Sequence, residues 1–176
     1  MDRKPIKCPT CTDQSRRRGV GMPFSVCVKD RMMYSHTFTF DDGVPFTTGC
    51  TAVVTATFEG PALGPYDILI DILVAQRLLR EVMELYDHKN LDTLPDFARP
   101  DGSRRNTTVE VMAQAVYQQL HARLQAHHQS VLATDGKGLG AVTAMHIKLE
   151  ESDVAFASYW EEAKAEGLFA GPPAGS

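Results

Sequence analysis

Two long stretches of alternating residues, joined by a tight turn sequence, constrain the fold of this chain most strongly. In residues 24–40 the even positions are largely apolar, and in residues 46–58 apolar residues alternate with threonines. A period of two is typical of a β-strand with one face in a core, and threonine suits the solvated face of an antiparallel sheet. Asp41-Asp42-Gly43 between the two stretches favours a hairpin.

Two helices and two further strands are expected after the hairpin. A short extended piece at residues 68–72 precedes a helix whose apolar residues are Leu78, Leu79, Val82, Met83 and Tyr86. A second helix starts near Asn106-Thr107-Thr108-Val109-Glu110, where Asn or Thr caps the helix and Glu110 reaches back. Its apolar residues are Val109, Met112, Ala113, Val116, Leu120 and Leu124. After a glycine-rich loop, strands are expected near 141–150 and 154–160, and the order β-β-α-α-β-β predicts an α+β fold with both helices on one face of an antiparallel sheet.

The length and composition predict one folded domain with loose ends. The chain has 176 residues and 43% hydrophobic content, enough for a sizeable core. We expect this domain at residues 23–162, a flexible basic leader at residues 1–22 and a flexible tail at residues 163–176. The expected sheet has free edges, and oligomerisation that closes it into a barrel would remove them.

Several classes of protein are excluded by the composition. The net charge of −4 gives no basis for general affinity for nucleic acid. No apolar run approaches the ~20 residues needed to span a bilayer, and the N-terminus lacks the apolar region of a secretory signal. We therefore expect a cytoplasmic protein with neither nucleic acid nor membrane as a partner. Cys8 and Cys11 have the spacing of half a zinc site, but no second such pair exists, so a mobile leader with two thiols is favoured.

Asp87 and His88 follow directly after the first expected helix and form the strongest candidate for catalysis. A carboxylate beside an imidazole can orient the ring, fix its tautomer and raise its basicity. Adjacent Asp and His residues are common by chance, so the pair indicates a catalytic site only if the surrounding segments follow a recognisable order. The stretches that matter are Ile70-Asp71-Ile72, Tyr86 to Asp92, Thr108-Val109-Glu110-Val111 and Leu149-Glu150-Glu151.

The order of these stretches resembles the pyruvoyl-tetrahydropterin synthase and carboxytetrahydropterin synthase family over roughly residues 24–160. In that family the second strand begins His-Gly-His, and a segment ending in Asp-Phe precedes the first helix. The helix exit reads Leu-Asp-His, the next helix opens Thr-x-Glu, and a late strand ends in Glu-Thr. The resemblance implies a T-fold (tunnelling fold), in which subunits pair their sheets into a barrel with pterin sites between subunits. The resemblance therefore implies a homo-oligomer, such as a hexamer.

The resemblance also implies roles for single residues. A buried Glu of the family binds the amino-pyrimidine edge of the pterin, and Glu150 occupies that position here. By strand alternation, Glu150 is expected on the same face as His146 and Lys148. Thr107 and Thr108 resemble the threonines that contact the pterin, although helix capping explains them equally well. Asp87 and His88 resemble the catalytic dyad.

The metal site of the family is degraded in this sequence. The family binds zinc with three histidines, of which His36 matches the first, whereas the His-Gly-His motif reads Thr48-Gly49-Cys50. His36 and Cys50 alone are expected to bind zinc weakly, so we expect no metal cofactor unless the fold supplies another ligand. The catalytic cysteine of the family falls at Val44, and no nucleophile replaces it.

These departures favour a reaction that needs neither zinc nor a thiolate. We expect a metal-independent dihydroneopterin aldolase that forms hydroxymethyl-dihydropterin and glycolaldehyde for a folate-like or methanopterin-like pathway. His88, oriented by Asp87, would be the base, with Lys89 or Tyr34 assisting. Three alternatives stay open: a zinc-dependent lyase of the pyruvoyl-tetrahydropterin synthase type with an altered site, a non-catalytic pterin-binding protein, and an oligomeric domain in which the Asp-His pair is structural.

Overall fold

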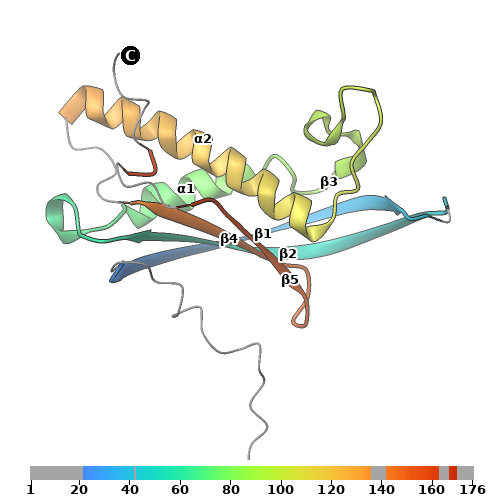
Figure 1. Cartoon of the computed structure of the whole chain (residues 1–176), viewed down its shortest axis with the longest axis horizontal. Helices are drawn as coiled ribbons and strands as arrows, with labels where there is room; N and C mark the ends of the chain where they lie inside the picture. Colours follow the sequence, from blue (N-terminus) through green and yellow to red (C-terminus); the bar gives the residue numbers. More distant parts are fainter. Residues whose placement is uncertain (1–21, 42, 136–141, 163–166, 170–176) are drawn as a thin grey trace, which may run out of the picture.

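A sheet with two helices on one face forms the protein (Figure 1). The computed structural model describes residues 22–41, 43–135, 142–162 and 167–169, and in these residues the five strands follow the order β3-β1-β2-β4-β5. The strands are β1 (Phe24–Thr39), β2 (Pro45–Gly60), β3 (Lys89–Asn90), β4 (Ala144–Glu150) and β5 (Phe156–Trp160). The described residues also form the helices α1 (Ile72–Met83) and α2 (Val109–Asp135) and the single-turn 3-10 helices η2 (Pro65–Asp67), η3 (Leu91–Thr93) and η4 (Pro95–Phe97).

The predicted α+β order is confirmed, with one addition between the helices. All neighbouring strands are antiparallel except β3, which runs parallel to β1 through two residue pairs. The two edges of the described sheet are β3 and β5. The sheet is open in the single chain, so its closure into a barrel stays a prediction.

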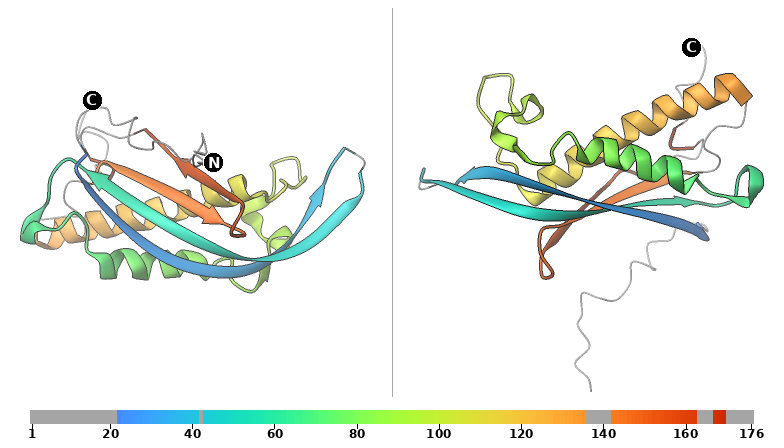
Figure 2. Two further views of the ribbon diagram at one scale, coloured as in Figure 1. Left: turned by 90° about the horizontal axis from the view of Figure 1, so that it is seen from below. Right: turned by 180° about the vertical axis from the view of Figure 1, so that it is seen from behind.

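The β1–β2 hairpin sets the faces of the sheet. Its strands pair from Phe24 and Gly60 to Thr39 and Pro45 without a break, and Figure 2 shows that the hairpin is long and curved. The turn extends beyond the helices, and Gly43 adopts φ 69° there, a left-handed conformation that glycine accepts without steric cost. The expected turn at residues 41–43 is therefore confirmed, although residue 42 lies outside the described residues.

The apolar faces predicted from alternation form the core. On β1 and β2 the buried apolar side chains are Val28, Met32, Tyr34, Ala52, Val54, Ala56 and Phe58. The helices cover this inner face with Leu78, Leu79, Val82 and Met83 of α1 and Met112, Ala113, Val116, Leu120 and Leu124 of α2. Burial of a large apolar side chain contributes roughly 1.5–3 kcal/mol, so this interface dominates the stability of the fold. None of the helices in the described residues combines the length and apolar character that a bilayer-spanning helix requires.

Helix capping corrects one expectation about the segment before α1. Residues 68–72 were expected to be extended, but Ile72 is already the first residue of the helix. The Asp71 carboxylate accepts hydrogen bonds from the backbone N–H groups of Leu73 at 2.8 Å and Val74 at 3.3 Å. These donors have no partner within the helix, so the cap starts the helix at this point.

The start of α2 agrees with the capping prediction. Thr108 Oγ1 accepts a hydrogen bond from the Val111 backbone N–H at 3.4 Å, and the Thr108 side chain lowers the pKa of Glu110 through a hydrogen bond. Asn106 does not cap the helix. Its side chain instead bonds both backbone groups of Thr39, at 3.1 Å to N and 3.0 Å to O, and so acts as a partner for the end of β1.

The predicted leader and tail lie almost entirely outside the described residues. Residues 1–21, including Cys8 and Cys11, are not described, and neither are 136–141, 163–166 and 170–176. Three residues of the expected tail are described, and of these Leu168 and Phe169 are buried. The Phe169 ring lies 5.6 Å from that of His121, so this part of the segment packs against α2.

We predict that Asp71→Ala lowers the free energy of unfolding by about 1 kcal/mol, because two N–H groups at the start of α1 lose their acceptor. Urea unfolding followed by circular dichroism measures the change. Glu81→Ala on the same helix is the control and should cost less than about 0.5 kcal/mol, because its carboxylate forms an exposed pair with Arg77 at the surface. Equal losses in both variants would contradict the assigned cap.

Candidate functional site

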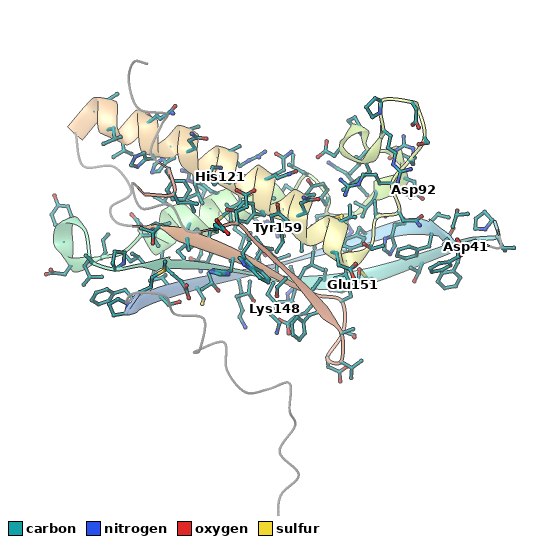
Figure 3. The ribbon with its side chains drawn as sticks, in the orientation of Figure 1. Asp41, Asp92, His121, Lys148, Glu151 and Tyr159 are labelled. Atoms are coloured by element: carbon teal, nitrogen blue, oxygen red, sulfur yellow. The ribbon has the colours of Figure 1, made fainter. Side chains whose placement is uncertain are left out.

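Polar side chains gather on the inner face of the sheet near the first turn of α2. Tyr34 pairs with Cys50 and His36 pairs with Thr48 in the β1–β2 ladder, and cross-strand partners lie on the same face. Glu151 follows the last residue of β4, and Figure 3 shows it beneath the N-terminal end of α2. Five side chains from three segments therefore share one region.

Tyr34 and Cys50 both turn toward the Glu151 carboxylate. The Tyr34 hydroxyl donates a hydrogen bond to Glu151 Oε1 at 2.7 Å, and Cys50 Sγ lies 3.8 Å from the same oxygen. Burial, with the Cys50 and Glu151 contacts, raises the pKa of Tyr34 far above its ordinary value, so the phenol stays protonated and donates. Burial is also the main cause that raises the pKa of Cys50, which keeps it a thiol at neutral pH.

His36 is held by the residue that precedes the cap of α2. The ring is buried, and its Nδ1 lies 2.8 Å from the Thr107 carbonyl oxygen and 3.0 Å from Thr107 Oγ1. A carbonyl oxygen only accepts, so Nδ1 carries the hydrogen in this contact. The ring also meets Phe38 edge-on, with centroids 4.4 Å apart.

The two predicted substrate-binding threonines have different environments. Thr107 is buried and contacts His36, so it belongs to the inner-face group. Thr108 is only half-buried, and its hydroxyl caps α2. The capping explanation therefore fits Thr108, and contact with a ligand stays a prediction for both residues.

Asp87 and His88 lie at the edge of the sheet, where the chain passes from α1 to β3. Asp87 Oδ1 accepts a hydrogen bond from the Met33 backbone N–H at 2.8 Å, and the His88 backbone N–H donates to the Met33 carbonyl at 2.6 Å. His88 has φ 56°, which turns the chain into β3. Its side chain is 70% exposed, and its Nε2 lies 3.8 Å from Asp87 Oδ2, within ion-pair range but beyond a hydrogen bond.

The dyad is separate from the inner-face group within one chain. Among the described residues, no hydrogen bond or ion pair connects Asp87 or His88 with His36, Cys50 or Glu151. Met33, to which the dyad is attached, is exposed, whereas its neighbour Tyr34 is buried. The structure therefore brings the predicted site residues together as two groups.

The structure does not bring Glu150 into the inner-face group. As expected from alternation, Glu150 shares a face with His146 and Lys148, and this is the face away from the helices. Lys148 Nζ lies 2.7 Å from Glu150 Oε1, and this hydrogen bond is the main cause that lowers the pKa of Glu150. Glu151, in contrast, contacts the buried Tyr34 on the inner face.

Glu151 is therefore the carboxylate that sequence reasoning missed. The signal was present in the alternation of β4, because Met145, Ile147 and Leu149 face inward and the next odd position is Glu151. The motif places a carboxylate at the end of this strand, but it does not state which of two adjacent glutamates faces the core side.

The donor set at the degraded metal position does not fit a zinc ion. His36 presents Nε2 as a ligand histidine would, with Nδ1 bonded to a carbonyl. Thr48 offers only a hydroxyl, and Cys50 is a thiol directed at Glu151. Within the described ranges, no three His, Cys, Asp or Glu side chains are placed to hold a metal together.

A cavity of about 280 Å³ lies elsewhere, between α2 and residues 95–105. Its lining residues are Tyr86, Asp96, Phe97, Arg105, Val111, Gln114, Ala115, Gln118 and Gln119. This lining includes none of the predicted site residues, so the cavity does not mark the candidate site.

Comparison with known proteins identifies the family. Residues 26–162 match the family model for 6-pyruvoyl tetrahydropterin synthase. The protein belongs to this family. It is thus a pterin-processing enzyme of a lyase family, and the resemblance seen in its motifs is confirmed.

Solved structures confirm the T-fold. The 6-pyruvoyl tetrahydropterin synthase of Plasmodium vivax is similar with a TM-score of 0.61 and 16% identity, covering 78% of this chain and 97% of that one. The Caenorhabditis elegans enzyme is similar with a TM-score of 0.57 and 15% identity, covering 82% of this chain and 100% of that one. No curated protein matches this chain by sequence.

We predict that the purified protein contains well below one zinc ion per chain, because only His36 of the three family positions offers a good ligand. The double substitution Thr48→His and Cys50→His should raise zinc to about one ion per chain by restoring three histidines. Inductively coupled plasma mass spectrometry measures the zinc content of the unmodified protein and of the double variant. One tightly held zinc ion in the unmodified protein would contradict the interpretation of this donor set.

Proposed function

We propose that this protein cleaves the side chain of a dihydropterin by a retro-aldol reaction that needs no metal ion. The observation that carries the proposal is the Glu151 carboxylate, held at 2.7 Å by the Tyr34 hydroxyl beside His36. In the family, a carboxylate at the end of this strand receives the amino-pyrimidine edge of the pterin. The N–H donors of that edge match a carboxylate acceptor, which makes such contacts strong and specific.

Glu151 replaces Glu150 as the proposed pterin anchor. Glu150 is engaged by Lys148 on the opposite face, whereas Glu151 shares its face with His36 and Thr107. His36 Nδ1 is engaged by Thr107, so Nε2 is the ring nitrogen that offers a second polar group to a bound ligand. Phe38 packs against His36 and adds an aromatic wall next to this group.

The reaction then requires one proton-transfer group and a carbanion acceptor. A base takes the proton from the hydroxyl on the second side-chain carbon, and the bond between the first and second carbons breaks. The second carbon leaves in glycolaldehyde as its carbonyl carbon, and the electron pair moves into the pterin ring. Return of a proton to the first carbon gives hydroxymethyl-dihydropterin. An imidazole can both accept and donate a proton, and His88 beside Asp87 is the proposed group.

The separation of the two groups supports a shared site in a homo-oligomer. The backbone N–H of His88 bonds the carbonyl of Met33 on β1. Met33 and His36 are three residues apart on this strand, which corresponds to about 10 Å between their backbones. We infer that Asp87 and His88 of one subunit serve the Glu151 group of another. An assembly such as a hexamer, in which sheets close into a barrel, would provide such sites and remove the open edges at β3 and β5.

A zinc-dependent lyase of the 6-pyruvoyl tetrahydropterin synthase type is the second candidate. One observation favours it, namely that His36 directs Nδ1 to a carbonyl and leaves Nε2 for a ligand. It requires ligands from outside the set formed by Thr48 and Cys50. The two candidates differ in their response to a chelator, which should abolish only the zinc-dependent reaction.

We predict that Glu151→Gln weakens neopterin binding about ten- to hundredfold, because a charged acceptor of the amino-pyrimidine edge is lost. The adjacent Glu150→Gln is the matched control and should change the Kd less than about twofold, since Glu150 lies on the outer face. Pterin fluorescence titration of the full chain measures both. If Glu150→Gln has the larger effect, the assignment of the anchor is wrong.

We predict that His88→Ala lowers kcat at least about 100-fold while the Kd for neopterin stays unchanged, because the imidazole moves protons and does not anchor the ring. The assay is anaerobic incubation of chelator-treated protein with dihydroneopterin, with products separated by chromatography. His127→Ala, a histidine on α2, is the control and should keep full turnover.

The same assay separates the candidate functions. Catalytic formation of hydroxymethyl-dihydropterin after chelation supports the aldolase. Activity that disappears on chelation and returns with zinc supports the zinc-dependent lyase. Binding of neopterin without any product, in either condition, would leave a pterin-binding protein, and unchanged turnover by the His88 variant would exclude His88 as the base.

A further inference from the structure

We propose that Tyr34 is a positioning residue for the substrate, because its hydroxyl holds Glu151 in the orientation that receives the pterin. The inference rests on the proposed function and deepens it by naming the residue that makes the anchor effective. Tyr34 is 4% exposed, and its hydroxyl oxygen lies 2.7 Å from Glu151 Oε1. The two residues are 117 positions apart in the chain, so the contact joins β1 to the end of β4.

The Tyr34 side chain is fixed from several sides. Its backbone lies between β2 and β3, where it pairs with Cys50 on one side and Lys89 on the other. Its ring is buried and meets the His36 ring edge-on, with centroids 5.3 Å apart. A hydroxyl on so constrained a ring has a defined position, which makes it a suitable donor for orienting another group.

Glu151 needs such a tether because the ladder does not hold it. The β4–β5 ladder ends at the pair of Glu150 and Phe156, and Glu151 begins the connection between the two strands. Outside the ladder, backbone pairing no longer holds the side chain in place. The alternation of β4 turns Glu151 toward the inner face, and the hydrogen bond from Tyr34, supported by the longer Cys50 contact, fixes the carboxylate there.

The same contacts also account for the altered metal position. Cys50 stands where the family has a zinc histidine, and here its thiol faces the Glu151 carboxylate. A half-buried carboxylate loses water and is stabilised by donors, and Tyr34 and Cys50 are both donors. The inner face of this chain is thus arranged to hold an anion, whereas the family motif is arranged to hold a cation.

The test is a double-mutant cycle on neopterin binding, measured by fluorescence titration of the full chain. Tyr34→Phe removes only the hydroxyl and should weaken neopterin binding about tenfold. In a Glu151→Gln background the same change should have almost no further effect, because Tyr34 acts through Glu151. Tyr86→Phe is the matched control and should leave the Kd for neopterin unchanged. Tyr86 is also a buried tyrosine, but its hydroxyl donates a hydrogen bond to Asp96, which lies outside the inner-face group.

A ligand comparison separates positioning from a general loss of structure. In the lumazine analogue of neopterin, oxygen replaces the 2-amino group, so one donor to the carboxylate is missing. Tyr34→Phe should therefore weaken binding of this analogue much less than binding of neopterin. If thermal unfolding shows that the Phe variant does not fold, carbon-13 NMR of wild-type protein with labelled tyrosines provides the test. Saturation with neopterin should shift the Tyr34 Cζ resonance, and Glu151→Gln should abolish the shift.

Each outcome decides between specific conclusions. Three results would overturn the positioning role while the proposed function stands. Folded Tyr34→Phe could bind neopterin as tightly as the wild type, or its loss of affinity could persist undiminished in the Glu151→Gln background. The third result is an equal loss of affinity for neopterin and for the lumazine analogue. Likewise, no Tyr34 shift in the labelled protein would overturn it. Wild-type protein that fails to bind neopterin would overturn the proposed function as well.

Discussion

The unbroken antiparallel ladder between β1 and β2 is the constraint on which the rest of the structure depends. Because side chains alternate with a period of two, a slip of one residue would move every side chain to the opposite face. The observed register places the apolar even positions against α1 and α2 and sets Tyr34 opposite Cys50 and His36 opposite Thr48. The same register leaves Met33 at the outer edge, where the segment after α1 attaches. Core and candidate site are therefore products of one pairing.

The candidate site consists of two groups with different physical character. In the inner-face group Tyr34, His36 and Thr107 are buried, and the Tyr34 hydroxyl and the Cys50 thiol face the half-buried Glu151 carboxylate. In the Asp87–His88 group the imidazole is open to solvent, whereas the Asp87 carboxylate is mostly covered and bonds the backbone of β1, so Asp87 contributes to the structure as well as to the environment of His88. A half-buried anion with fixed donors is suited to recognition, whereas an accessible imidazole is suited to proton transfer. This division agrees with a site completed by a second subunit.

Much of the fold could be predicted because its signals are local. The alternation at residues 24–40 and 46–58 predicted β1 and β2, and the Thr108 cap predicted the start of α2. The two-residue strand β3 was not predicted, because its pairing depends on the turn at His88 and on Met33, which lies more than 50 positions earlier. Residues 68–72 were expected to be extended, because an apolar run alone does not reveal that Asp71 caps a helix.

The sequence by itself determined the faces of the strands, the order of the elements and, through the order of its motifs, the family. Tertiary structure decided that Tyr34 and Cys50 meet Glu151, that His36 contacts Thr107, and where the Asp87–His88 pair lies relative to both contacts. The decisive contacts join residues 117 positions apart for Tyr34 and Glu151 and 71 apart for His36 and Thr107. Local patterns report which face a residue occupies, but only packing of the whole chain determines which distant side chains meet on that face.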